Sequence, residues 1–278
     1  PGYLEFVGER MQGLQAADAA FIEVSARSGI KVGTERSFEA AKEMGMPITF
    51  VINKIDKENS SFEKVYKELK EKFGINTVAL QIPVIRKHII EGIIDVLHGT
   101  FSVYDLKKNE TVLKEIPADY EELHKAYYSE LMEIISESSE EYLTSYLNNG
   151  SLTEEEMKAG LKKGIQDGEI YPVLCISAQY CRGIQLLLDY ICESMPSPFE
   201  KIFSYKDENN DEQVGPLSKS ESENLAFIFK TIADPFVGKL SFVKVLRGTV
   251  SVNTTVYNAN INKEEKVNSL YAVCGKEQ

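Results

Sequence analysis

The fold is decided by the stretch Pro47-Ile48-Thr49-Phe50-Val51-Ile52-Asn53-Lys54-Ile55-Asp56. Its first part is a run of apolar and β-branched residues that starts after a proline. Such a run is typical of a strand buried on both faces, as in a parallel sheet. Polar and charged side chains follow at once, so we expect the strand to end at Asn53. The motif Asn-Lys-X-Asp therefore stands directly after a buried strand.

This motif has the chemistry to recognise guanine. Guanine presents two adjacent hydrogen-bond donors, N1–H and the N2 amine, and the carboxylate of Asp56 can accept both. Adenine lacks this pair and would leave a buried carboxylate unsatisfied, so such a site rejects it. The stem of Lys54 can lie along the base while its ammonium stays in water. The alternative is a solvated charged loop, because four-residue motifs also arise by chance.

Two further stretches favour the guanine site. Ser177-Ala178 follows a second buried-strand pattern at residues 171–176 and precedes a helix pattern. Small residues there allow a backbone N–H to approach the O6 acceptor of guanine, which a bulky side chain would block. Pro1-Gly2 places a glycine where a backbone N–H can approach a γ-phosphate, and the segment that follows can change conformation with that phosphate.

Residues 1–82 alternate between helix and strand patterns. This rhythm predicts an α/β fold with a parallel sheet and helices on both of its faces. The helix at residues 62–73 has Ser60 or Ser61 as its N-cap and ends at Gly74. The other patterns are helices at residues 6–17 and 32–44 and strands at residues 19–24, 47–53 and 77–83.

The alternation of helix and strand patterns stops at Pro83 and resumes near residue 170. Between them we expect an α+β insertion over residues 83–169. The first domain then comprises residues 1–82 and 170–200. Within the insertion the patterns predict short strands at residues 89–90, 92–96 and 99–104 and helices at residues 118–135, 140–147 and 154–166. The strand at residues 171–176 and a helix at residues 183–195 complete the first domain.

The last part of the chain changes character twice. Residues 201–224 are polar and predict a linker. From Leu225 onward, β-branched and aromatic residues alternate, which predicts a second, β-rich domain at residues 225–278. Its expected strands are residues 226–232, 238–245 and 254–258, with a turn or bulge at Gly248.

Composition narrows the classes of function. The chain has 278 residues, of which 43% are hydrophobic, so it can form a core. Its net charge of −12 argues against a dedicated DNA-binding protein but leaves RNA partners open. No apolar stretch approaches the length of a membrane span, and we expect no signal peptide. Four cysteines without CxxC spacing indicate free thiols in a reducing cytoplasm.

Taken in order, these stretches resemble the translational GTPases of the elongation factor G family. The tyrosine after Pro-Gly is more similar to the elongation-factor-G-like paralogues. The resemblance covers nearly the whole chain and implies part of a P-loop GTPase domain, an inserted subdomain and the start of a β-barrel second domain. It rests on Pro1-Gly2-Tyr3-Leu4-Glu5-Phe6-Val7-Gly8-Glu9, Ala16-Ala17-Asp18-Ala19-Ala20, residues 29–35, Asn53-Lys54-Ile55-Asp56, Ile176-Ser177-Ala178, Gly183-Ile184-Gln185, Met195-Pro196-Ser197-Pro198 and Asp234-Pro235-Phe236-Val237-Gly238-Lys239.

The resemblance implies a role for each residue of the base site. Asp56 would bind guanine N1 and N2, and Lys54 would pack along the base and ribose. Asn53 would brace the phosphate-binding loop. Ser177 and Ala178 would approach O6. Gln179 is the last residue that we assign to GTP binding in this loop.

At the start of the chain the resemblance implies two more roles. Gly2 would sense the γ-phosphate. Tyr3 stands where related elongation factors carry a catalytic histidine that orients the attacking water. A phenol with a pKa near 10 is a poor base at neutral pH, although it can still hold a water by hydrogen bonding. No residue of the chain is assigned to a metal.

The phosphate-binding half of such a site is missing from the sequence. The pattern GxxxxGK[ST] occurs nowhere in the 278 residues, and the Mg²⁺-binding Ser or Thr of that loop is missing with it. Phosphate clamping and metal bridging supply most of the catalysis in this reaction class. We therefore expect an internal piece of a longer protein. That protein would use GTP or GDP with Mg²⁺, while the chain alone would be inactive and hold neither.

Three functions remain open. The first is a cytoplasmic elongation-factor-G-like GTPase that works on the ribosome, in translocation or a related step, without DNA or membrane partners. The second is a tetracycline-resistance ribosomal protection protein or a GTPase release factor. The long insertion favours the first, since it exceeds an ordinary loop. The third is a non-catalytic module that docks on the ribosome or another protein.

Overall fold

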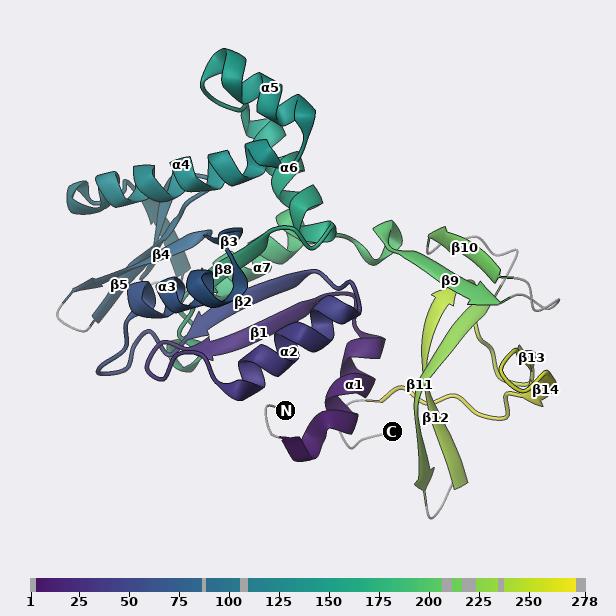
Figure 1. Cartoon of the computed structure of the whole chain (residues 1–278). Coiled ribbons are helices and arrows are strands. Elements are labelled where there is room, and N and C mark those ends of the chain that lie inside the picture. The colour runs from purple at the N-terminus through teal and green to yellow at the C-terminus, as the bar shows by residue number, and fades with distance from the viewer. Residues whose placement is uncertain are drawn as a thin grey trace. The chain divides into compact units, whose positions relative to one another are not determined.

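The computed structural model describes residues 4–86, 89–105, 110–206, 212–216, 224–234 and 238–273. The chain forms two compact units, Pro1–Pro196 and Ser197–Gln278 (Figure 1). Among the described residues, no helix combines the length and the apolar character needed to cross a membrane.

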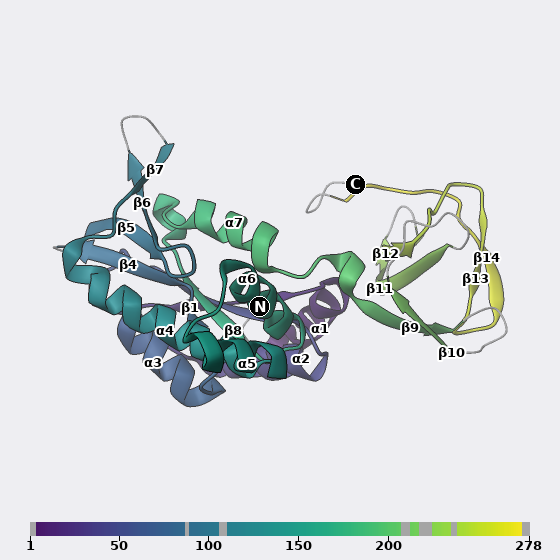
Figure 2. The same cartoon turned by 90° about the horizontal axis from the view of Figure 1, so that it is seen from above.

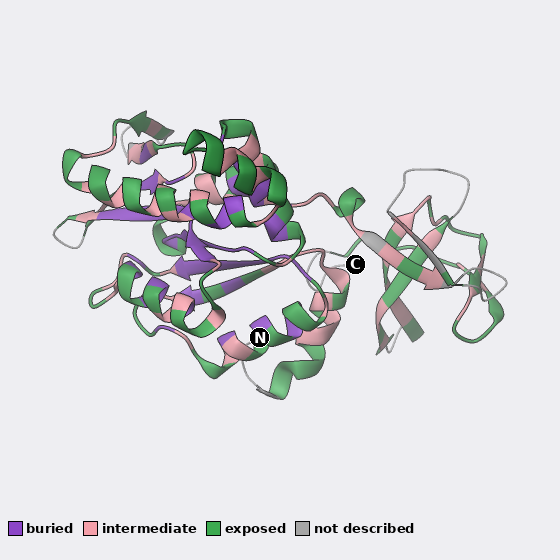
Figure 3. Ribbon diagram, turned by 45° about the horizontal axis from the view of Figure 1, so that its top comes forward, coloured by how far each residue is buried: buried purple, intermediate pink, exposed green. Residues whose placement is uncertain are grey.

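A parallel sheet lies at the centre of the first unit. Its strand order is β1-β2-β8-β3, and every neighbouring pair is parallel. Figure 3 shows that its strands carry many of the buried residues. The predicted α/β class is confirmed. The strands are β1 (Ala20–Ser25), β2 (Ile48–Asn53), β3 (Thr77–Ala79) and β8 (Tyr171–Cys175).

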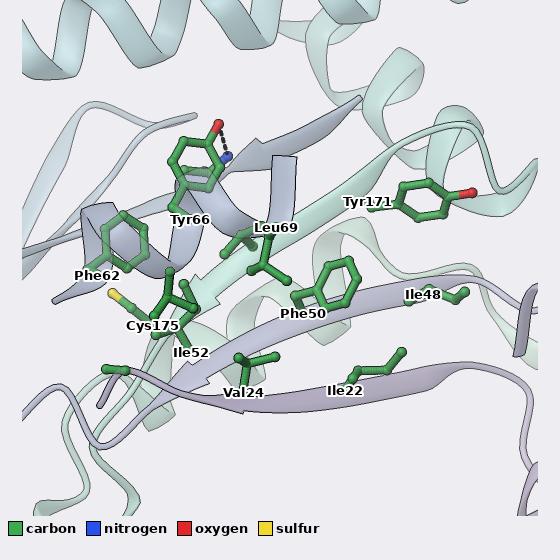
Figure 4. Packing of buried hydrophobic residues seen from close by; sticks show 14 of the residues in the cluster. Ile22, Val24, Ile48, Phe50, Ile52, Phe62, Tyr66, Leu69, Tyr171 and Cys175 are labelled. Atoms are coloured by element: carbon green, nitrogen blue, oxygen red, sulfur yellow. Dashed lines mark hydrogen bonds between the residues drawn. The ribbon is translucent and has the colours of Figure 1, made fainter. Parts of the chain in front are cut away.

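Helices cover both faces of this sheet, as the sequence predicts (Figures 1 and 2). Phe50 of β2 packs in one hydrophobic cluster with Leu69 of α3, as Figure 4 shows. Phe38 of α2 belongs to the same cluster and stacks on the Phe50 ring. The neighbouring Thr49 faces the other way, and its hydroxyl lies 2.7 Å from that of Tyr190 on α7. This alternation follows from the twofold period of a strand. The helices are α1 (Val7–Ala16), α2 (Val32–Glu43), α3 (Phe62–Phe73) and α7 (Ile184–Ser194).

The ends of α3 lie where the sequence places them. The Ser61 hydroxyl accepts a hydrogen bond from the backbone N–H of Lys64 at 3.2 Å, which is an N-cap. At the other end Gly74 has a φ of +109°, a value that glycine adopts without strain. The apolar stripe of α3 packs on the sheet, with Phe62, Val65 and Leu69 buried in the same cluster as Phe50.

The insertion contains a second sheet and three helices. The sheet is antiparallel with the order β4-β5-β6-β7. A second hydrophobic cluster joins it to the helices and to the far face of the parallel sheet. Its elements are β4 (Gln81–Arg86), β5 (Ile89–Asp95), β6 (Thr100–Asp105), β7 (Glu110–Lys114), α4 (Glu121–Glu137), α5 (Glu140–Asn149) and α6 (Glu154–Gln166).

Four details in and beside the insertion differ from the prediction. Residues 77–83 are not one strand, because the chain passes at Leu80 from β3 of the parallel sheet into β4 of the antiparallel one. Residues 89–90 and 92–96 are not separate strands, since β5 runs through Glu91 with that side chain exposed. Strand β7 was not predicted, and the helix expected at residues 118–135 opens with a 3-10 turn, Ala118–Tyr120.

The second unit consists of paired antiparallel strands, in agreement with the predicted β character. The segment expected as a linker, residues 201–224, contains the hairpin of β9 and β10. Strand β14 was also missed, because its sequence is entirely charged and shows no alternation. The pairs are β9 (Ile202–Lys206) with β10 (Glu212–Pro216), β11 (Leu225–Asp234) with β12 (Gly238–Arg247), and β13 (Thr255–Asn258) with β14 (Lys263–Lys266).

Candidate nucleotide-binding site

Two loops meet at the carboxyl ends of the adjacent strands β2 and β8. The backbone N–H of Ala178 donates to Asn53 Oδ1 at 3.1 Å. The hydroxyl of Ser177 donates to Asp56 Oδ1 at 2.6 Å. The parallel pairing of the two strands places both loops at the same edge of the sheet. The structure thus brings together motifs that are far apart in the sequence.

Asn53 links three strands of the sheet. Its Oδ1 accepts from the backbone N–H of Lys54 at 2.7 Å as well as from Ala178, and its Nδ2 donates to Glu23 of β1 at 3.2 Å. The Ala178 N–H, which we expected to meet guanine O6, is engaged with Asn53. Lys54 has a φ of +65°, and its side chain is exposed, so its stem is free to lie along a base.

Asp56 places a carboxylate in the site that is nearly buried. Its side chain is only 7% exposed. Oδ1 accepts from Ser177, but among the described residues Oδ2 has no hydrogen-bond donor and only an ion pair with Lys57 Nζ at 3.3 Å. The ion pair offsets part of the cost of burying this oxygen, and Oδ2 still has lone pairs that can accept hydrogen bonds from a ligand. The two donors of guanine would satisfy it, so this carboxylate fits the base that the sequence suggests.

The carboxylate of Asp56 is held in its charged form. Burial acts to raise its pKa, but the hydrogen bond from Ser177 and the ammonium of Lys57 act against this. The net pKa lies below the ordinary value of 3.8. The group is therefore ionised at neutral pH, as acceptance of two donors requires.

Lys57 is a site residue that the sequence prediction missed. Its ammonium donates to Gln179 Oε1 at 2.5 Å and lies 6.0 Å from the centre of the Tyr180 ring. Together with the Asp56 ion pair, these contacts bridge the two loops. The only available signal was its place directly after the motif, which gives no hint of a partner on the other loop.

Two predicted residues, Gly2 and Tyr3, lie outside the described residues, so their roles stay predictions. Within the described ranges, no three residues among His, Cys, Asp and Glu gather as a metal site.

Comparisons with known proteins agree with this geometry. Residues 1–197 match the family model described as the elongation factor Tu GTP binding domain, and residues 223–278 match that of elongation factor G domain 2. An elongation factor G-like protein from Thermotoga maritima is 34% identical over 279 aligned residues, covering 100% of this chain and 40% of that protein.

A solved structure of a protein from Thermus thermophilus resembles the fold with a TM-score of 0.82 at 29% identity. The match covers 100% of this chain and 38% of the other. The chain thus spans well under half the length of the relatives that it matches. Because a GTP-binding domain model and a domain 2 model together match most of its length, this chain belongs to the elongation factor G family of translational GTPases.

Proposed function

We propose that the whole protein containing this chain binds and hydrolyses GTP in the cytoplasm to drive a ribosome-linked step of protein synthesis. The step is translocation or a closely related one. The observation that carries this proposal is the ionised, buried carboxylate of Asp56, with Oδ1 held by Ser177 and Oδ2 in an ion pair with Lys57 but, among the described residues, accepting no hydrogen bond. A carboxylate in this state is suited to a base with two adjacent donors.

The roles in base binding follow from the same contacts. Asp56 accepts guanine N1–H and N2–H, and Lys54 covers the base. Ser177 holds Asp56 in place, and Asn53 fixes the two loops to each other. Gln179 and Lys57 close the side of the site between the loops.

The chain alone is expected to lack the reaction. No GxxxxGK[ST] pattern occurs in the 278 residues, so the groups that clamp the phosphates and hold Mg²⁺ must come from elsewhere in the whole protein. The metal ion would neutralise charge on the phosphates. Gly2 and Tyr3 would meet the γ-phosphate and the attacking water.

Titration with Mg-GTP and Mg-GDP, followed by a hydrolysis assay with and without ribosomes, tests the proposal. The whole protein should bind both nucleotides and hydrolyse GTP faster with ribosomes. The chain alone should show no hydrolysis and weak GDP binding at most. Sub-micromolar binding of Mg-GTP by the chain alone, or a whole protein inert toward GTP on ribosomes, would contradict the proposal.

A second candidate is a tetracycline-resistance ribosomal protection protein or a GTPase release factor. The insertion at residues 83–169, with its own sheet and three helices, favours the elongation-factor-G type over both. A third candidate is a non-catalytic docking module. The observation that favours it is that the 278 residues contain no GxxxxGK[ST] pattern. The hydrolysis assay on the whole protein separates this third candidate from the other two.

A further inference from the structure

The loop that carries Ser177 and Ala178 rests on the inserted sheet. Ser177 and Arg182 close this loop through two backbone hydrogen bonds, each of 3.0 Å. At the closing point, the guanidinium of Arg182 stacks on the ring of Tyr104 in β6, with 4.2 Å between its central carbon and the ring centre. The base-reading loop and the insertion are therefore joined at a residue that also shapes the loop.

The next residue, Gly183, shows how closely the two parts approach. Its φ is +76°. A Cβ atom at this position would lie 2.6 Å from the Cδ1 of Ile93 in β5 and 2.6 Å from the carbonyl oxygen of Cys175 in β8. Only glycine tolerates both this backbone angle and this proximity. The inserted sheet thus lies directly against the end of the loop.

A small cavity beside this contact leaves the junction incompletely packed. Its volume is about 30 Å³, enough for one or two water molecules. It is lined by residues of the loop and of β5, β6 and β7, including Tyr104, Arg182 and Gly183. Within the described residues, Arg182 Nη1 and the hydroxyl of Ser102, a residue only 6% exposed, have no hydrogen-bond partner.

The guanidinium of Arg182 thus stacks on a ring face, while its Nη1 makes no hydrogen bond with the described residues. A stacked contact with free space beside it can shift more easily than a close-packed core. Movement of β6 would be transmitted to Arg182, and through its backbone bonds to Ser177, which orients the Asp56 carboxylate. The path from the insertion to the base site is three contacts long.

We infer that Tyr104 and Arg182 are positioning residues through which the inserted sheet sets the affinity of the site for guanine nucleotides. This inference rests on the proposed function. A partner that displaced β6 would weaken nucleotide binding. By thermodynamic reciprocity, a bound nucleotide would weaken the binding of that partner to the same extent. Both residues act through the geometry of the loop, because their link to Asp56 runs through the backbone bonds between Arg182 and Ser177.

Release of a fluorescent GDP analogue from the whole protein, followed by stopped flow, tests this inference. Tyr104→Ala should release GDP about three- to tenfold faster, which is the range expected for one lost cation–π contact. Tyr104→Phe keeps a ring face and should stay within about twofold of the wild type. Arg182→Lys keeps the charge but not the planar stack, so it should release GDP as fast as Tyr104→Ala. It replaces Tyr104→Ala as the test variant if Tyr104→Ala does not fold.

Tyr128→Ala is the matched control. Tyr128 is an insertion tyrosine on α4 that packs near His124 and does not line the cavity. It should lower the melting temperature without changing GDP release. Unchanged release in Tyr104→Ala and Arg182→Lys, or an equal acceleration in Tyr128→Ala, overturns the inference while the proposed function stands. A wild-type protein that binds no GDP would instead overturn the proposed function.

Discussion

At the scale of single residues, the site depends on a carboxylate that stays charged although it is nearly buried. Asp56 achieves this through Ser177, which contacts Oδ1, and Lys57, which contacts Oδ2. The sequence identified Asp56 and Ser177, since each closely follows a strand pattern. It could not identify the Lys57–Gln179 contact, because a lysine in a charged loop shows no preference for any partner. The same limit applies to the Ala178 N–H, whose engagement with Asn53 depends on the tertiary structure.

Removal of the Ser177 hydroxyl should destabilise the fold in a way that depends on pH. Ser177→Ala should lower the free energy of unfolding by about 1.5–3 kcal/mol at pH 7, the usual range for a hydrogen bond to a charged group. Because the pKa of Asp56 is below 3.8 in the fold, this contribution is present above that pH and is lost as the pH falls through the folded value. Urea unfolding from pH 7 downward measures the difference.

Ser60→Ala is the control for that experiment. The Ser60 hydroxyl donates to the carbonyl of Ile55, a neutral acceptor in the same loop. The decrease in unfolding free energy caused by Ser60→Ala should therefore not vary with pH. A Ser177→Ala deficit that stayed constant or grew below pH 4 would show that Ser177 does not act through the charge of Asp56.

At the scale of elements, long periodic segments were predicted well and short or charged ones were not. Helix α3 has its cap, its stop and its apolar stripe in the sequence, and its bounds agree with the prediction. The passage from β3 to β4 is hidden inside one apolar run, because both sheets bury their strands. The hairpin of β9 and β10 is masked by polar composition. In β14 the pairing comes from backbone hydrogen bonds, which the side chains do not reveal.

The hydroxyl of Tyr66 joins α3 to β3 and to the insertion. It accepts from the N–H of Ala79 at 3.3 Å and lies 3.1 Å from Glu130 Oε2. Tyr66→Phe leaves the buried Ala79 N–H without its acceptor, so we expect a loss of about 1–3 kcal/mol in unfolding free energy. Chemical denaturation measures it. Tyr127→Phe, whose hydroxyl has no partner among the described residues, should cost less than about 0.5 kcal/mol; equal losses would contradict this.

His98 ties the turn between β5 and β6 to α7. Its Nδ1 lies 3.1 Å from Asp95 and its Nε2 3.1 Å from Glu193. The hydrogen bond with Asp95, and then that with Glu193, outweigh burial and raise the pKa of His98 from 6.5 to about 9. Because the pKa is raised in the fold, the charged His98 side chain stabilises the folded state fully below pH 6.5. This contribution is lost as the pH rises through about 9.

We therefore expect His98→Gln to lower the melting temperature most at about pH 6 and least above about pH 9. Thermal unfolding of both proteins across this range measures the difference. Glu193→Gln should reduce the pH dependence in part, since Asp95 remains. A difference between His98→Gln and the wild type that increases with pH would refute the assignment.

At the scale of the whole molecule, the two units match different domains of the family. The first holds the loops that follow β2 and β8, for which we propose contact with the base, and the second is a β unit that matches elongation factor G domain 2. The α/β class followed from the alternation of strand and helix patterns alone. No GxxxxGK[ST] pattern occurs in the 278 residues, so we propose that the chain supplies the part of a GTP site that contacts the base.

The most direct test of that central claim is the nucleotide preference of the whole protein carrying Asp56→Asn. An asparagine amide can accept N1–H and donate to the C2 oxygen of xanthine, but it cannot accept both donors of guanine. We predict that the affinity for GDP falls by roughly a hundredfold or more while that for xanthosine diphosphate rises above it. Equilibrium titration of both nucleotides gives the answer. Unchanged affinity for GDP in the variant would show that Asp56 does not read the base.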